Sequence, residues 1–192
     1  MATSPTAQSG SDIAQYIQDF YRVSAERDFA RDFNFRLLSI NPGPASTVTF
    51  DSDDLVYIKT ATIPERNITN IAVPYMGLQF NVPGNATYPN SESYQLTFYC
   101  DENSTIRQKF EQWSRDVFND ASSTGNYFSP TQNATLNLVQ LDNQQNVVAQ
   151  YQLVGVSVRN VGPLQYNMAD GNGATVEFTV TLSYHYWTRI TP

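Results

Sequence analysis

The stretch TVEFTVTLSYHYW, from Thr175 to Trp187, decides the fold class. Apolar residues occupy every second position from Val176 to Tyr186, and Thr, Ser, Glu and His fill the positions between them. A period of two places one set of side chains on a packed face and the other on a wet face, as in a β-strand. The pattern predicts one strand, roughly 40 Å long at about 3.3 Å per residue, with Tyr184 and Tyr186 on the packed face.

A strand of this length at the edge of a lone subunit would pair with other chains. The residues predicted on its wet face include one carboxylate, Glu177, and neither Lys nor Arg. Such a surface is unusual for an isolated protein and suits the wall of a barrel that several subunits share.

Composition narrows the class of protein further. The chain has 192 residues with 12 Tyr and 11 Phe, which suits one strand-rich domain with a substantial core. A formal charge of −7 and a pI near 4.5 argue against a general affinity for nucleic-acid phosphates. A single cysteine, Cys100, excludes an internal disulfide. The first ten residues lack the apolar centre of a secretory signal, and no apolar run reaches about 20 residues, so we expect cytoplasmic synthesis and no membrane anchor.

The order of elements predicts residues 1–11 as a flexible N-terminal arm and 12–192 as a single domain. A short helix follows Ser11 or Asp12, and a longer one follows Asn103 or Ser104. Segment 67–89 is predicted as loop with short extended pieces, because Pro74, Gly77, Pro83 and Gly84 interrupt it. Alternating patterns predict strands near 33–37, 48–50, 55–63, 94–100, 136–141 and 147–158. The fold is therefore predicted to be mainly β, with one helix packed on a sheet or barrel.

No catalytic, cofactor or metal site emerges from the residues. The sole histidine, His185, lies on the polar side of the alternating stretch, and no serine is marked as its nucleophilic partner. The acidic run Asp51, Asp53 and Asp54 lacks the Gly and distal Glu of a calcium loop, so a charged turn is the simpler interpretation. We expect a protein that assembles and is not an enzyme.

At the level of the whole chain, the ordered segments resemble the tail-tube proteins of contractile-tailed, T-even type bacteriophages. The resemblance covers roughly residues 12 to 188, and no single motif decides it. Its segments include DFAR at 28–31, KTATIP at 59–64, NVPG at 81–84, RQKF at 107–110, NVGPLQ at 160–165 and the final Tyr186-Trp187. The polar arm before Ser11 and the turn at 41–54 look longer than the family pattern.

The resemblance implies hexameric rings in which each subunit contributes strands to one continuous β-barrel. Stacked rings would form the inner tail tube, a virion component assembled in the bacterial cytoplasm. Its expected partners are further copies of itself, the tail sheath protein, the tape-measure protein, a baseplate initiator, and viral DNA that passes without sequence-specific binding. A translocating polyanion needs a wall that does not retain it, so the candidate lumen-facing residues are Glu177, Thr179, Thr181 and Ser183.

Four arginines near the N-terminus form a second candidate site. They account for four of the eleven cations in a chain that has 18 carboxylates. Guanidinium groups bind carboxylates through paired hydrogen bonds, so this segment could dock on an acidic or carbonyl-rich surface of a neighbouring ring. Solvated surface charges are the alternative interpretation. The candidate docking residues are Arg22, Arg27, Arg31 and Arg36.

Other functions fit parts of the pattern. The chain could be a baseplate-proximal tube initiator, or the tube protein of a type VI secretion system or a contractile bacteriocin. A sugar-binding β-sandwich is a more distant alternative, because Tyr and Trp on strands can stack on sugars. That alternative requires an exposed aromatic patch.

Overall fold

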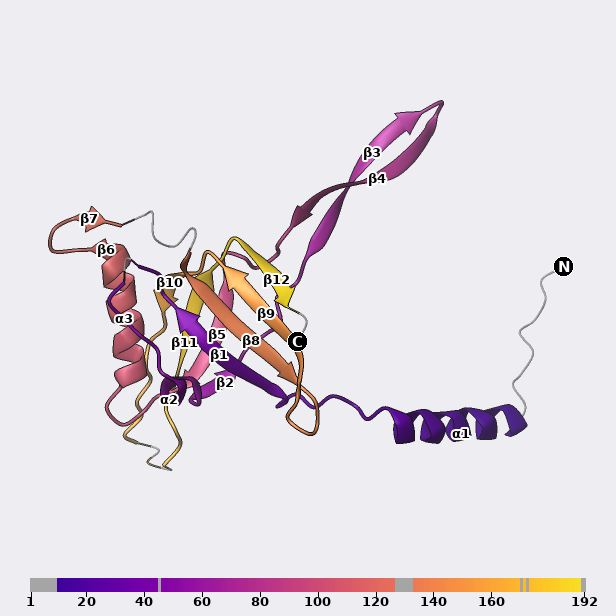
Figure 1. Cartoon of the computed structure of the whole chain (residues 1–192), viewed down its shortest axis with the longest axis horizontal. Helices are drawn as coiled ribbons and strands as arrows, with labels where there is room; N and C mark the ends of the chain where they lie inside the picture. The colour runs from indigo at the N-terminus through magenta and orange to yellow at the C-terminus, as the bar shows by residue number, and fades with distance from the viewer. Residues whose placement is uncertain (1–9, 45, 127–132, 170, 172, 191–192) are drawn as a thin grey trace.

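The computed structural model describes residues 10–44, 46–126, 133–169, 171 and 173–190. Its body consists of two β-sheets packed face to face, with one helix along an open side of the pair (Figure 1). A long two-stranded hairpin and an N-terminal helix project from the body in different directions (Figure 1). The predicted mainly β fold is confirmed, and within one subunit the two sheets form a sandwich instead of a closed barrel.

Each sheet of the body has four strands, and both sheets use strands from distant parts of the chain. The first sheet has the order β1 (Phe35–Asn41), β8 (Thr135–Leu141), β9 (Val147–Val154) and β12 (Tyr186–Ile190). The second has the order β10 (Ser157–Val161), β11 (Glu177–Ser183), β5 (Tyr94–Tyr99) and β2 (Ile58–Thr60). Every pairing between these strands is antiparallel.

The core lies between the sheets and beneath α3 (Thr105–Val117). Alternate residues of β5 and β11 point into it, including Phe98, Phe178 and Leu182, because a strand exposes successive side chains on opposite faces. Phe110 and Trp113 of α3 complete the core, and the Phe110 ring lies 5.3 Å from that of Phe98. The predicted apolar face of this helix is therefore its buried face.

The start of α3 follows the sequence prediction in position only, because Ser104 precedes the helix but its side chain makes no capping hydrogen bond. Asp101 accepts a hydrogen bond from the backbone N–H of Thr105 at 2.9 Å, which satisfies a free donor of the first turn. Arg107 donates to Glu111 at 2.8 Å and to the carbonyl of Gly162 at 2.6 Å, so it ties the helix to the end of β10. A short helix, α2 (Ser52–Leu55), is joined to α3 through Lys109, whose ammonium lies 2.6 Å from the Asp54 carboxylate.

The prediction of one continuous strand from 175 to 187 is wrong. β11 ends at Ser183, the chain turns at Tyr184 and His185, and β12 begins at Tyr186 in the opposite sheet. The phase of the alternation changes at this corner, so Tyr186 is 45% exposed while Trp187 packs on the core. Alternating hydrophobicity continues through such a corner because the residues on both sides of it face a core.

Segment 67–89 is also corrected by the structure. Instead of a loop it forms the hairpin of β3 (Asn67–Tyr75) and β4 (Leu78–Thr87). A second, very short hairpin, β6 (Phe118–Asn119) with β7 (Thr124–Gly125), follows α3. Proline is tolerated in β3 and β4 because a two-stranded ribbon leaves half of its backbone donors without a ladder partner.

The N-terminal helix α1 (Gly10–Glu26) has 17 residues and extends beyond the short helix that the sequence predicted. The predicted flexible arm at 1–11 lies mostly outside the described residues, and α1 already includes Gly10 and Ser11. Within the described ranges, no helix has the length and apolar character that crossing a membrane requires. The assignment of 12–192 to one domain stays a prediction.

Candidate assembly surfaces

The β3–β4 hairpin is built around a two-residue turn. Tyr75 lies opposite Leu78, and between them Met76 and Gly77 have φ angles of 48° and 79°. Two successive positive φ angles are typical of a type I′ turn, whose twist matches that of the two strands. The turn therefore directs a regular ribbon away from the body.

Between Ile71 and Val82, one face of this ribbon is wholly apolar. Direct cross-strand partners are Ile71 with Val82, Val73 with Phe80, and Tyr75 with Leu78, and residues two apart in a strand share a face. The exposed fractions of their side chains range from 43% to 65%. We call these six residues the hairpin face: Ile71, Val73, Tyr75, Leu78, Phe80 and Val82.

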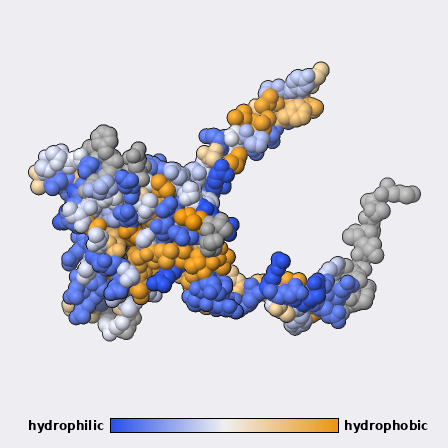
Figure 2. Space-filling view, viewed as in Figure 1, coloured by the Kyte–Doolittle hydropathy of each residue, from blue (hydrophilic) through white to orange (hydrophobic). Residues whose placement is uncertain are grey.

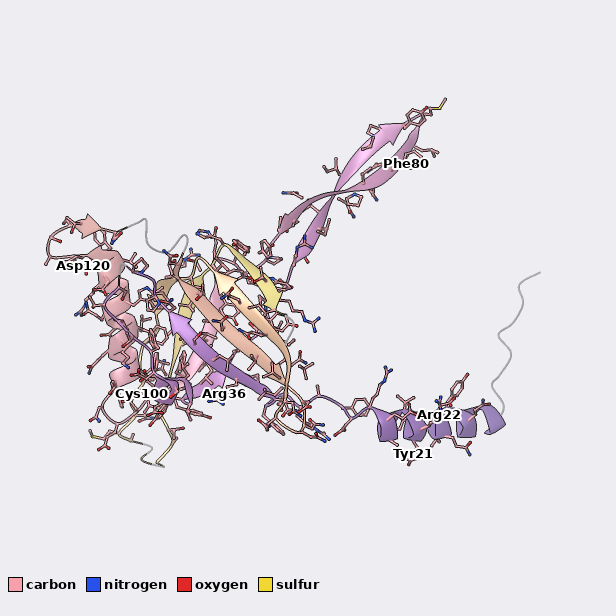
Figure 3. All side chains as sticks on the ribbon, viewed as in Figure 1. Tyr21, Arg22, Arg36, Phe80, Cys100 and Asp120 are labelled. Atoms are coloured by element: carbon pink, nitrogen blue, oxygen red, sulfur yellow. The ribbon has the colours of Figure 1, made fainter. Side chains whose placement is uncertain are left out.

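The rest of the hairpin is uncharged and mixes polar with apolar residues. Its opposite face carries Ala72, Pro74, Gln79 and Asn81, and the whole segment 67–90 contains no Asp, Glu, Lys or Arg. Hydrophobic residues follow the projecting ribbon in the space-filling view (Figure 2), and Phe80 lies on it well away from the body (Figure 3). A contiguous apolar surface on such an extension is typical of a contact with another protein. Alternation on both sides of the Met-Gly pair was the sequence signal for this hairpin, and the interrupting prolines obscured it.

The four candidate lumen residues share the outward face of the second sheet. Thr179 lies 3.2 Å from the hydroxyl of Thr97 on β5, and Ser183 lies 2.7 Å from that of Ser157 on β10. Glu177 forms an ion pair with Lys59 of β2. The structure thus places Glu177, Thr179 and Ser183 of β11 in contacts with three other strands, β2, β5 and β10, on one polar surface.

This face also carries a cation, Lys59, which the pattern of residues 175–187 could not reveal because Lys59 lies on β2. The hydrogen bond to Glu177 raises the pKa of Lys59, and burial opposes that shift only partly. Its ammonium also lies 5.5 Å from the centre of the Tyr99 ring. The pair Lys59–Glu177 carries no net charge, so the outward face of the second sheet remains close to neutral.

The outward face of the first sheet is a second polar surface, which sequence reasoning did not identify. Asn137 on β8 donates to the Ser39 hydroxyl at 2.8 Å and accepts from Gln150 on β9 at 3.4 Å. Gln152 lies directly opposite Asn137 in the register of β8 and β9. The alternating amides of β8 and β9 were the available signal, and they give this sheet a nearly uncharged outer surface.

The structure does not gather the four candidate arginines into one site. Arg22 on α1 lies 3.2 Å from Asp19, and Arg31 lies 3.7 Å from Asp28, so both have carboxylate partners within the chain. Arg36 is on β1, far from Arg22 on α1 (Figure 3). Arg27 and Arg36 have no ion pair among the described residues.

Residues with the potential for chemistry are dispersed in the described ranges. No group of three or more His, Cys, Asp or Glu there could hold a metal ion. His185 packs against Gly155 at the corner between β11 and β12, and Cys100 is half-buried beside Ser104, with 3.4 Å between the sulfur and the hydroxyl. The surfaces described above are therefore the main candidates for function.

Several solved structures have a fold similar to that of this chain. The fold resembles a chain of the anti-feeding prophage cap, the AFP tube terminating cap, with a TM-score of 0.57 at 8% identity over 86% of this chain and 93% of that one. A chain of the PVC extracellular contractile injection system, in its extended sheath–tube complex, has a TM-score of 0.57 at 8% identity over 97% and 100% of the two chains. A chain of the AFP baseplate gives 0.53 at 14% identity over 86% and 97%. These likenesses show the shared fold.

The family follows from the sequence itself. No curated protein sequence matches the chain. The family model described as phage tail tube protein matches residues 24–190, which is most of the chain and includes every strand of both sheets. The match favours a structural protein over a sugar-binding sandwich. The chain therefore belongs to the phage tail tube protein family.

Proposed function

We propose that the protein is the inner-tube subunit of a contractile phage tail, that it forms hexameric rings, and that the stacked rings conduct the genome. The observation that carries this proposal is the hairpin face. Its six apolar side chains are exposed in the single subunit, and a two-stranded ribbon cannot bury them by itself. A second copy supplies the missing contact.

The shape of the subunit supports repeated assembly. The hairpin projects from one end of the body, whereas α3 covers another side (Figure 1). A projection that fits a different surface on the next copy makes a head-to-tail contact, which closes into a ring or continues as a filament. The outer strands β1 and β12 of the first sheet, and β10 and β2 of the second, are where sheets of neighbouring subunits could join into one wall.

The wall of the conduit must not bind the polyanionic DNA that passes through it. The lumen-facing residues that we propose are Glu177, Thr179, Thr181 and Ser183, on the near-neutral face of the second sheet. The amide face of the first sheet, around Asn137 and Gln152, is the rival surface. Both faces suit passage of DNA without binding, because cations that would attract phosphates are few or paired.

The remaining partners follow from this role. Rings would contact the sheath protein on their outside, the tape-measure protein within, and a baseplate initiator at one end. Of the four arginines proposed for docking between rings, Arg27 and Arg36 are the most available, since Arg22 and Arg31 have partners in their own chain. The protein would act in the virion after assembly in the host cytoplasm.

The hairpin face provides the test. Phe80→Asp should reduce assembly into rings and tubes by about tenfold or more, since a buried aromatic side chain contributes about 1.5–3 kcal/mol. Gln79→Asp places the same charge on the opposite face of the same strand and is the matched control. Sedimentation velocity and negative-stain microscopy measure the assemblies. If Phe80→Asp assembles like the parent protein, the hairpin face is not the contact and the proposal loses its main support.

A second candidate function is the ring that starts or ends the tube. One observation favours it: most of helix α1 precedes residue 24, where the family match begins. Quantifying copies of the protein in purified particles separates the two roles. Six copies per particle would identify a terminal ring, and a number that grows with tail length would identify the main tube.

A further inference from the structure

Helix α1 carries an exposed apolar stripe. Ile17, Phe20 and Val23 recur at a spacing of three residues, which places them on one side of a helix. Their side chains are 52%, 56% and 47% exposed. Asp19 and Glu26 flank this α1 stripe next to Val23 on the helical surface, and the family match begins only at residue 24. The stripe is thus a feature of this chain beyond the family match.

The structure holds the stripe away from its own body. Only Arg27 separates Glu26, the last residue of α1, from Asp28, whose carboxylate accepts a hydrogen bond from Asn143 at 2.5 Å. The same Asn143 amide donates to the carbonyl of Phe29 at 3.3 Å. The Phe29 ring stacks on Phe20, with 6.0 Å between the ring centroids, which joins the segment after the helix to α1. These contacts direct α1 outward from the turn between β8 and β9 (Figure 3).

A receiving groove lies on the body, at the edge of β1. It has a volume of about 380 Å³, and its apolar lining includes Phe33, Phe35, Leu55, Val56 and Ile58. Phe33 is 69% exposed and Val56 is 73% exposed, which are high values for apolar side chains. Arg36 and Lys59 also line this groove, which we call the α2 groove. Lys59 and Asp19 already have partners in their own chain, but Arg36 has no ion pair among the described residues, and its charge complements Glu26 beside the stripe on α1.

We infer that α1 of one subunit docks its apolar stripe in the α2 groove of a second copy of this chain. The inference rests on the proposed function, since it requires assembly. Helix α1 is about 25 Å long at 1.5 Å per residue and projects from the body. In a head-to-tail contact, the helix of one copy would bury its apolar stripe in the groove of the next copy. This contact is separate from the contact of the hairpin, because it involves α1 and the α2 groove instead of β3 and β4.

Site-directed cross-linking tests the inference. Two chains are prepared in a Cys100→Ser background, one with Ile17→Cys and the other with Val56→Cys, and they are mixed, assembled and oxidised. Every disulfide between these two variants joins different subunits, so a covalent heterodimer on a non-reducing gel is the expected result. Gln18→Cys mixed with Val56→Cys is the matched control, because Gln18 lies on the polar side of α1. It should give at least several-fold less heterodimer.

The outcomes separate the inference from the proposed function. Rings or tubes that form without an Ile17–Val56 cross-link overturn the docking of α1 and leave the tube proposal standing, with another protein covering the stripe. A chain carrying both cysteines that cross-links only within itself assigns the groove to its own helix and also overturns the inference. A protein that remains monomeric at all concentrations overturns both.

Discussion

At the scale of single residues, one corner of the molecule depends on the absence of a side chain. Gly155 has a φ of 73°, and a Cβ at this position would lie 1.9 Å from Cδ2 of His185. The backbone N–H of Gly155 donates to Ala134 at 2.9 Å, and that of His185 donates to Val154 at 2.9 Å. Here β9 leads into β10 and β11 leads into β12, so both segments cross between the sheets at one point.

We expect Gly155→Ala to lower the free energy of unfolding by about 2 kcal/mol or more, since both the positive φ and the clash oppose a methyl group. Gly77→Ala is the control, because Gly77 has a φ of 79° with open space around it. This variant therefore measures the loss of unfolding free energy that the positive φ alone causes. Urea unfolding compares the two variants. An equal loss for both would show that contact with His185 contributes nothing.

A second residue-scale prediction concerns pH. Burial raises the pKa of Asp116, but hydrogen bonds from Ser46, Thr47 and Gln112 outweigh burial, so the pKa lies below its ordinary value of 3.8. A folded-state pKa below that of the unfolded chain stabilises the fold at higher pH, and this contribution is lost as pH falls through the lowered pKa. The difference in unfolding free energy between the parent and Asp116→Asn should therefore shrink below about pH 4.

Chemical denaturation at a series of pH values measures that difference. Asp120→Asn, in the exposed turn after β6, is the control and should change the unfolding free energy by no more than about 0.5 kcal/mol. If the Asp116→Asn difference stays constant between neutral and acidic pH, the contacts with Ser46 and Thr47 do not depend on the charge of the carboxylate.

At the scale of elements, the sequence predicted those whose local pattern and tertiary role coincide. The helix at 105–117 has an apolar face, a buried core position and a first turn that Asp101 caps, and β5 alternates regularly, whereas Val139 interrupts the alternation of β8. The prediction of one continuous strand at 175–187 was wrong because alternation cannot reveal that the chain changes sheets at His185. The prediction of a loop at 67–89 was wrong because local sequence outweighed tertiary context. Pro74 and Pro83 are typical of a loop, yet a ribbon outside the sheets tolerates them.

The position of β11 changes what a proline substitution tests. Val180 is fully buried, and β11 pairs with β10 on one side and β5 on the other, both from its own chain. Val180→Pro should therefore unfold the subunit, which circular dichroism would detect as lost strand signal and early thermal melting. Thr181→Ala, on the outward face, should change the unfolding free energy by no more than about 0.5 kcal/mol. A folded Val180→Pro monomer that cannot assemble would instead place β11 at a junction between subunits.

At the scale of the whole molecule, the two sheets offer two polar faces for a channel. The candidate residues of β11 do share one face, as the alternation predicted, and that part of the site was readable from sequence. The sequence could not show that Asn137 and Gln152 form a comparable face on the other sheet, because the pairing of β8 with β9 creates that surface. In the tube that we propose, contacts between subunits decide which sheet faces the lumen.

A pair of double variants distinguishes the faces. Glu177→Lys with Thr179→Lys places unpaired cations beside Lys59 on the second sheet, and Asn137→Lys with Gln152→Lys does so on the first. We expect the former to slow DNA ejection from particles, more strongly at low salt, because phosphate attraction weakens as salt screens it. The latter should leave ejection unchanged. The reverse result would assign the lumen to the first sheet.

The absence of charge from the hairpin has a thermal consequence. A contact made by the hairpin face gains its free energy from removing apolar surface from water, and this gain weakens on cooling and strengthens with sulfate or phosphate salts. Ionic strength by itself has little to screen along residues 67–90. Contacts of this kind between subunits would weaken at low temperature and persist at high salt concentration. A particle could therefore move from dilute to saline surroundings with its tube intact.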